Sequence, residues 1–141
     1  MKVYEFSLFG NPTSWNRPAR GRHGKRYDSQ KSLKEQIQLY IQANCITPIV
    51  PPKNTPVQAE ITFCFQPPAS MSKKKRDSLI GTLKFTKPDL DNLEKFLYDT
   101  IEKAYFYNDS QVAEHTTRKV YSNTVRTDVK IIVGGKTTWH E

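Results

Sequence analysis

The chain has few of the residues on which thiol, redox and nucleotide-binding sites are usually built. Its 141 residues include two cysteines, three histidines and six glycines. Cys45 and Cys64 fall in separate predicted elements without metal-type spacing, so we interpret both as reduced thiols of a cytoplasmic protein. The histidines at positions 23, 115 and 140 show no ligand spacing, and there is no glycine-rich phosphate loop or Ser/His/Asp arrangement. These absences argue against thiol enzymes, phosphate-loop enzymes and serine hydrolases.

Long apolar runs are absent too. No stretch approaches the ~18 apolar residues of a membrane span, and residues 1–5 do not resemble a signal peptide. A hydrophobic fraction of 36% with 11% aromatic residues is typical of a globular chain rather than a disordered one. We therefore expect one domain at residues 1–133, a frayed tail at 134–141, and no membrane partner.

Positive charge is abundant and unevenly distributed. Residues 1–88 hold 15 Lys and Arg against 5 Asp and Glu, whereas residues 89–141 hold 7 against 9. A polyanion such as DNA would bind the first region through phosphate contacts. The acids of the second region would repel DNA unless a cation lay between them. A basic surface that only improves solubility remains an alternative.

Two basic segments are candidate DNA contacts. The loop at 13–27 interleaves arginines and lysines with aromatic side chains, and its proline and glycines predict no regular structure. Arginine forks and flat rings suit phosphates and unstacked bases. The second segment lies in a short helix predicted near 72–80, just before an acidic motif, and for both a merely solvated surface stays possible. The candidate DNA-binding residues are Arg17, Arg20, Arg22, Lys25, Arg26, Lys73, Lys74, Lys75, Arg76 and Lys87.

Hydrophobic periodicity predicts an α+β fold. Strands are expected at 2–9, 57–66, 110–122 and 124–133, and helices at 29–44, 72–80 and 90–104. We expect a single mixed sheet of about four strands with helices packed on one face, in the order β-α-β-α-β-β, and a hairpin turn at Ser122-Asn123. In the first long helix, capped by Asp28 or Ser29, the apolar face would comprise Leu33, Ile37, Tyr40 and Ile41. In the second it would comprise Leu90, Leu93, Leu97, Ile101 and Ala104, followed by an aromatic turn at 105–108.

The acidic motif at residues 87–95 reads KPDLDNLEK. Asp89 falls at the predicted N-cap of the helix and Asp91 in its first turn. The positive end of the helix dipole is a sufficient structural reason for acids there. Alternatively, two or three carboxylates can hold Mg²⁺, which activates water for phosphodiester hydrolysis. The pair alone is a weak signal, because Asp-x-Asp also occurs in glycosyltransferases and phosphatases.

Lys95 and Asp109 would complete such a site. Lys95 lies one turn beyond Asp91, where its ammonium could stabilise charge on a phosphate in the transition state. As a plain i,i+4 salt bridge it would contribute only about 0.3–0.5 kcal/mol. Asp109 precedes the next strand, and we expect it to return to the helix N-terminus if helix and strand pack antiparallel. A 15-residue helix spans about 22 Å, so the connection must cover that distance.

The motif at 87–95, followed by Asp99 and the sequence NDSQV at 108–112, resembles the RusA family of Holliday junction resolvases. The resemblance is strongest over 87–121. The first strand, the Arg-Pro-x-Arg sequence at 17–20 and the Tyr-Asp pair at 27–28 match more loosely. The family often has two consecutive acids where this chain has Asn108 and Asp109, which leaves Asp109 as the candidate.

This resemblance implies a homodimeric, Mg²⁺-dependent endodeoxyribonuclease, with Mn²⁺ a possible substitute. Such an enzyme makes paired symmetric nicks in four-way junction DNA during recombination and repair, typically in a phage or prophage. By matched position, Asp89, Asp91 and Asp109 would bind the metal and Lys95 would be the catalytic lysine, with Asp99 in support. A two-fold dimer also suits a two-fold substrate that needs two cuts. Two alternatives remain, a junction-binding protein without cleavage activity and a metal-dependent enzyme acting on another phosphate, such as a nucleotide.

Overall fold

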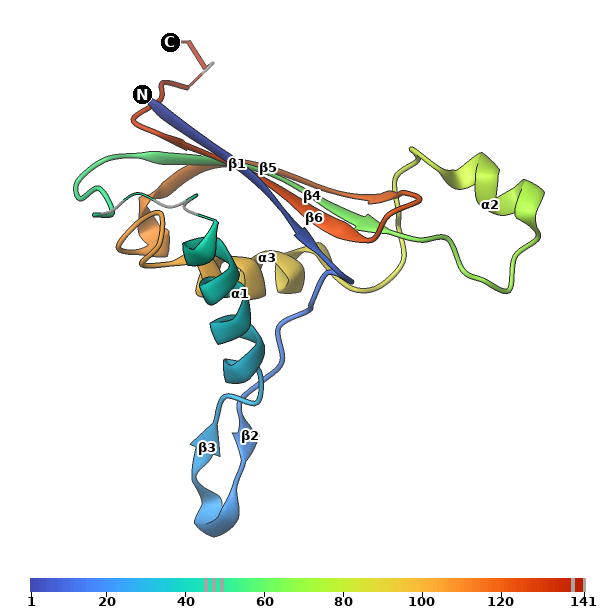
Figure 1. Cartoon of the computed structure of the whole chain (residues 1–141), viewed down its shortest axis with the longest axis horizontal. Helices are drawn as coiled ribbons and strands as arrows, with labels where there is room; N and C mark the ends of the chain where they lie inside the picture. The colour runs from blue at the N-terminus through green and yellow to red at the C-terminus, as the bar shows by residue number, and fades with distance from the viewer. Residues whose placement is uncertain (45, 47, 49, 138, 141) are drawn as a thin grey trace.

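The structure, a computed structural model, describes residues 1–44, 46, 48, 50–137 and 139–140 (Figure 1). Cys45 therefore lies outside the described residues. The elements confirm the α+β class. The six strands are β1 (Lys2–Phe9), β2 (Ala19–Arg20), β3 (Arg26–Tyr27), β4 (Val57–Phe65), β5 (Val112–Tyr121) and β6 (Arg126–Val133). The three α-helices are α1 (Lys31–Ala43), α2 (Lys73–Leu79) and α3 (Leu90–Ile101), with 3₁₀ turns at Arg22–Gly24 and Asp109–Gln111.

Four strands form the expected mixed sheet, in the order β1-β6-β4-β5. β4 pairs parallel with β5 and antiparallel with β6, which also pairs with β1. The prediction of a hairpin between the last two strands is wrong, because β4 lies between β5 and β6 in the sheet. The backbone N–H of Ser122 donates to the carbonyl of Phe65 at 2.8 Å, so the connection passes the end of β4. Alternation of apolar residues identifies the buried face of a strand but not its neighbours.

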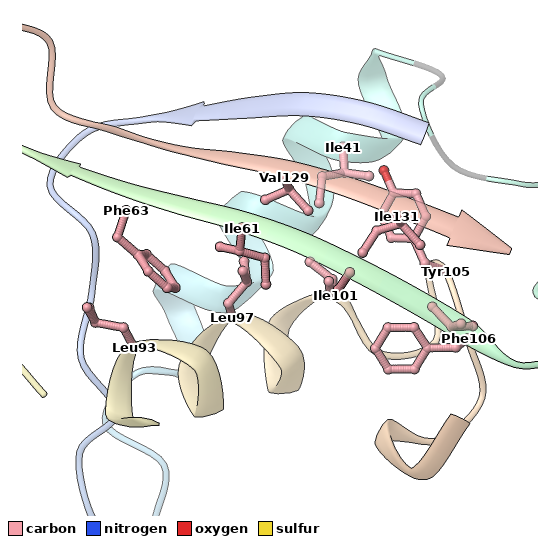
Figure 2. Packing of buried hydrophobic residues seen from close by; sticks show 12 residues of the cluster. Ile41, Ile61, Phe63, Leu93, Leu97, Ile101, Tyr105, Phe106, Val129 and Ile131 are labelled. Carbon is pink, nitrogen blue, oxygen red and sulfur yellow. The ribbon is translucent and has the colours of Figure 1, made fainter. Parts of the chain in front are cut away.

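Helices α1 and α3 cover one face of this sheet, as expected (Figure 1). α3 turns Leu93, Leu97 and Ile101 toward Ile61 and Phe63 of β4 (Figure 2), and each of these side chains is at most 3% exposed. At roughly 1.5–3 kcal/mol for each large apolar side chain, this burial fixes α3 against the sheet. The direction of α3 therefore depends on the core, and this direction sets where its polar first turn lies.

The aromatic turn expected after α3 belongs instead to the core. Tyr105 and Phe106 are fully buried. The Tyr105 ring stacks on Phe6 of β1 with centroids 5.3 Å apart, and its hydroxyl donates to the carbonyl of Ile46 at 2.9 Å. Burial, with a smaller contribution from Tyr4, raises the pKa of Tyr105.

The apolar face predicted for α1 is buried only in part. Ile41 is buried and Ile37 packs against the core, but Leu33 and Tyr40 are exposed. Leu33 is exposed because the first turns of α1 extend beyond the sheet, toward β2 and β3 (Figure 1). The N-cap residue is Gln30 rather than Asp28 or Ser29. The Asp28 carboxylate nevertheless accepts from the N–H of Gln30 at 2.9 Å.

The basic loop at 13–27 has more structure than its composition predicts. Ala19 pairs with Tyr27 and Arg20 with Arg26, so β2 and β3 form a short hairpin that projects from the body (Figure 1). The other basic segment is the expected helix α2, whose N-cap is Ser72. The Ser72 hydroxyl accepts from the N–H of Lys75 at 3.3 Å. α2 stands beyond one end of the sheet (Figure 1).

The sheet face opposite α1 and α3 is polar. Cys64 of β4 is nevertheless only 1% exposed, and burial raises the pKa of its thiol. The tail expected to fray is attached where the structure describes it: Gly134 donates to the Pro56 carbonyl, and the hydroxyl of Thr137 donates to Glu114. None of the helices in the described part of the chain is long and apolar enough to cross a bilayer.

Candidate active site

Asp89 and Asp91 are both exposed at the start of α3. Asp89 is the N-cap residue, yet its side chain accepts no capping hydrogen bond. Among the residues that the structure describes, the Asp91 carboxylate accepts only from the neighbouring N–H of Asn92, at 3.0 Å. No lysine or arginine in the described ranges forms an ion pair with either carboxylate. Asp89 therefore lies at the positive end of the helix dipole without making a capping hydrogen bond, and both carboxylates are exposed to solvent.

The segment that leads into these acids is fixed by Lys119 of β5. The Lys119 ammonium donates to the carbonyl of Thr86 at 2.6 Å and to that of Pro88 at 2.8 Å. Earlier in the same segment, the backbone N–H of Lys84 donates to the carbonyl of Lys119, and Leu83 forms a β-bridge with Val120. No local pattern identifies Lys119, because its partners lie more than 30 residues earlier in the chain.

Lys95 follows on the same helix and contacts Trp15. Its ammonium nitrogen lies 3.5 Å from the centroid of the indole ring. The alternative of an i,i+4 salt bridge with Asp91 is not realised among the described ion pairs. Asp99, the supporting acid, lies 3.9 Å from Lys34 of α1, so it contributes to the contact between the two helices.

Asp109 lies at the other end of α3. It lines a surface hollow with Tyr98 and His115, beside the second half of the helix. β5 does run antiparallel to α3, but this orientation brings the end of the strand, not its start, to the first turn of the helix. Since a strand rises about 3.3 Å per residue, Val112 and Lys119 are roughly 23 Å apart. One chain thus brings Asp89, Asp91 and Lys95 to one end of α3 and Asp109 to the other.

A cluster of mutually bonded side chains separates these two ends. One Glu94 carboxylate oxygen lies 3.0 Å from Nδ1 of His115, and the other accepts from the hydroxyl of Thr117 at 2.5 Å. The Tyr98 hydroxyl lies 3.3 Å from the same histidine nitrogen. Burial, with a smaller contribution from Glu94, raises the pKa of Tyr98. Within the described residues, no group of three or more Asp, Glu, His or Cys side chains is arranged to hold a metal ion.

Basic side chains flank the start of α3 on two elements. Those of the β2–β3 hairpin are exposed, as are Lys87 and the lysines of α2, whereas Arg76 is half-buried. A pocket of about 300 Å³ next to the hairpin is lined by Trp15, Arg17, Pro18, Arg20 and Arg26. In Figure 1 the segment after α2 leads directly to α3, and the chain leaves β1 toward the hairpin near the same place. Both basic elements are therefore connected to the segment that carries the acids.

A larger hollow of about 500 Å³ lies on the open face of the sheet. Most of its charged groups have partners: Lys130 lies 3.8 Å from both Glu5 and Glu60, Asp128 accepts from the neighbouring Arg126 at 3.0 Å, and Arg118 donates to the hydroxyl of Thr62 at 2.9 Å. The hydrogen bond to Asp128 raises the pKa of Arg126. These mutual pairs distinguish this hollow from the open acids at the start of α3.

A mixed sheet backed by helices carries exposed acids and a lysine on one helix, and exposed basic side chains on two elements connected to its start. These are the residue types that cleavage of a nucleic-acid backbone requires. The chain belongs to the RusA endodeoxyribonuclease family, because the family model described as Endodeoxyribonuclease RusA matches residues 10–132. The enzyme is accordingly a hydrolase of DNA, and the family expected from the motif is confirmed.

Two relatives match nearly the whole chain. The uncharacterized protein YqaN of Bacillus subtilis (strain 168) is 32% identical over 141 residues, covering 93% of this chain and 96% of the relative. A protein of Lactococcus phage r1t, named crossover junction endodeoxyribonuclease rusA, is 29% identical over 136 residues, covering 91% of this chain and 95% of the relative.

Proposed function

We propose that this protein is a Mg²⁺-dependent, structure-specific endonuclease that resolves Holliday junctions by paired symmetric nicks. It would act in recombination and repair in the cytoplasm, in a phage or prophage setting, with Mn²⁺ able to replace Mg²⁺. The observation that carries the proposal is the pair of open carboxylates, Asp89 and Asp91, between two basic surfaces. The name of the relative from Lactococcus phage r1t supports the choice of junction substrate.

The residues at the start of α3 fit a hard divalent cation. Mg²⁺ prefers carboxylate oxygens and keeps several positions for water and phosphate, which suits two exposed carboxylates. When bound, such an ion neutralises phosphate charge and lowers the pKa of its water. Asp89 and Asp91 would supply the ligands, and Lys95 would place a positive charge near the non-bridging oxygens of the phosphate. The arginines of the hairpin and the lysines of α2 would bind the flanking phosphates.

The third carboxylate is the reason for proposing a homodimer. In one chain, Asp109 is separated from Asp89 by the length of α3, about 18 Å for 12 residues. A second copy related by a two-fold axis can bring its Asp109 to the first turn of this helix, and the same contact then forms twice. Each dimer would hold two complete sites, one for each of the symmetric cuts.

The test compares a labelled four-way junction with a linear duplex of the same sequence, with and without Mg²⁺. We expect symmetric Mg²⁺-dependent nicks in the junction, lost in Asp91→Asn and retained in the control Glu35→Gln, an exposed acid of α1. Tight junction binding without cutting in Mg²⁺ or Mn²⁺ would indicate an architectural protein instead. Hydrolysis of free nucleotides with no salt-sensitive DNA binding would indicate a phosphohydrolase.

A further inference from the structure

The shortest lysine–aromatic contact in the described part of the chain joins Lys95 to Trp15. The ammonium nitrogen lies 3.5 Å from the ring centroid, whereas the other such pairs are separated by 4.6 to 5.9 Å. An aromatic face attracts a cation within about 6 Å, and tryptophan is the strongest such partner. Since no described carboxylate pairs with Lys95, the indole determines where this ammonium lies.

Trp15 is held in place although it lies in a loop. Its backbone N–H donates to the carbonyl of Asn92 in α3 at 3.0 Å. On either side, the Gln30 side chain donates to the Ser14 carbonyl at 2.8 Å and accepts from the N–H of Asn16 at 3.1 Å. Gln30 is only 8% exposed, and a buried amide that uses both its donor and its acceptor restricts the backbone that it bridges. The indole is thus presented from a fixed backbone.

An aromatic ring has an advantage over an acid as the partner of a catalytic ammonium. A carboxylate would neutralise the charge and compete with phosphate for the N–H donors. A ring face orients the ammonium but leaves its net charge and most of its donors available. Asp91 and Asp99 lie four residues before and after Lys95, yet neither forms a described ion pair with it. Lys95 is therefore oriented by the ring, and no described carboxylate occupies its N–H donors.

We propose that Trp15 is a positioning residue for Lys95, holding its ammonium where the phosphate is cut. This inference rests on the proposed function. Trp15 also forms one wall of the pocket that contains Arg17, Arg20 and Arg26. A DNA strand held by these arginines would therefore lie next to the ammonium, so Trp15 joins the DNA-binding hairpin to the catalytic helix.

The decisive experiment is a double-mutant cycle measured as kcat and KM on a four-way junction in Mg²⁺. Trp15→Leu should lower kcat at least about tenfold, as expected for a misplaced catalytic group, with KM within about threefold. Trp15→Phe keeps an aromatic face and should recover most of the loss. In the Lys95→Met background, measured with excess enzyme in single turnovers, Trp15→Leu should have no further effect. Tyr40→Leu, which removes an exposed ring from α1, is the matched control and should cut like the wild type.

A second readout is independent of cutting. Stacking on an indole should move the NMR signals of the Lys95 ε-methylene upfield, an effect lost in Trp15→Leu and partly retained in Trp15→Phe. Equal losses in both Lys95 backgrounds, a parallel loss of junction affinity, or an unshifted ε-methylene would overturn the inference. If the wild type does not cut the junction at all, the proposed function fails instead, and the NMR signal still decides whether the contact exists.

Discussion

The two halves of α3 carry acids in very different surroundings. In the first turn, Asp89 and Asp91 form no described ion pair, although basic surfaces lie on both sides. In the rest of the helix, Glu94 bonds to His115 and Asp99 approaches a lysine of α1. Paired acids attach α3 to its neighbours. Acids without an ion pair contribute little to the fold, so the start of α3 is the candidate position for a divalent cation.

The strongest test of this comparison replaces one acid without an ion pair and one paired acid of α3 by the corresponding amides. Asp91→Asn should lower the cutting rate by roughly 10²–10³-fold or more, while junction binding is unchanged or tighter because negative charge near phosphate is removed. Glu94→Gln should leave most of the cutting and instead lower the free energy of unfolding by about 1 kcal/mol, the usual value of a lost hydrogen bond. Cutting rates and urea unfolding curves measure both. Equal loss of activity in the two variants would contradict the distinction.

A mixing experiment asks whether Asp109 acts across the dimer. Asp91→Asn and Asp109→Asn should each be inactive alone. When the two are unfolded and refolded together, mixed dimers contain one site with both substitutions and one site with neither. We therefore expect restored cutting of one strand, seen as single rather than paired nicks. If Asp109 serves the site of its own chain, every site carries one substitution and mixing restores nothing.

Lys119 should act on Asp89 and Asp91 indirectly, because it fixes the backbone that leads into them. Lys119→Met removes the two hydrogen bonds to the carbonyls of Thr86 and Pro88. We expect a 10–100-fold lower cutting rate, typical of residues that support metal ligands, and a higher Mg²⁺ concentration for half-maximal activity. Lys130→Met, which removes a lysine from the open face of the sheet, is the control and should leave the Mg²⁺ dependence unchanged. An unaltered Mg²⁺ titration in Lys119→Met would reject this role.

Changes to the basic surface of α2 should weaken DNA binding rather than lower the cutting rate. Replacing Lys73, Lys74 and Lys75 by glutamine should weaken junction binding and reduce the slope of log K against log salt by up to about 2.7, or 0.9 for each phosphate contact. The cutting rate at saturating enzyme should change little, because the open acids are intact. Fluorescence anisotropy between 50 and 200 mM salt measures the slope, and an unchanged slope would exclude α2 from the DNA contact.

The smallest expected effect concerns Asp28, a paired acid next to the hairpin. The Lys34 ammonium, 2.8 Å away, and then the N–H of Gln30 lower the pKa of its carboxyl. A lowered pKa in the folded state stabilises the protein above the unfolded pKa of about 3.9, and this contribution disappears as pH falls through the folded value. Asp28→Asn should therefore cost less than about 1 kcal/mol at pH 7 and still less at pH 3, below the unfolded pKa, as measured by urea unfolding. An equal cost at both pH values would show that charge is not the cause.

Local sequence patterns predict the elements well and their neighbours poorly. The alternation from Val57 onward identifies β4, and the apolar stripe through Leu93 and Leu97 identifies the buried face of α3. The same patterns cannot show that β4 lies between β5 and β6, because strand order depends on contacts between distant segments. They also miss the burial of Tyr105, which stacks on Phe6 of β1, and of Phe106, whose ring meets Tyr98 of α3 edge-on.

The candidate site divides in a similar way. Asp89, Asp91 and Lys95 are close in sequence and share one helix, so the motif alone predicts that they lie at one end of it. The position of Asp109 depends on the direction of β5, and that of Trp15 depends on the buried side chain of Gln30. Neither dependence is visible in a local pattern, which is why the sequence identifies Asp109 without placing it and does not single out Trp15.

The β-bridge between Leu83 and Val120 also has a consequence for self-association. β5 is an edge strand, and an uncovered edge can accept a strand from another molecule. Over Lys119–Tyr121 that edge is already occupied by residues 81–84 of the same chain. A second copy that approaches the start of α3 must therefore dock through side chains, since the sheet cannot be extended there. The last residues of β5 are also protected from the edge pairing that starts fibrous aggregates.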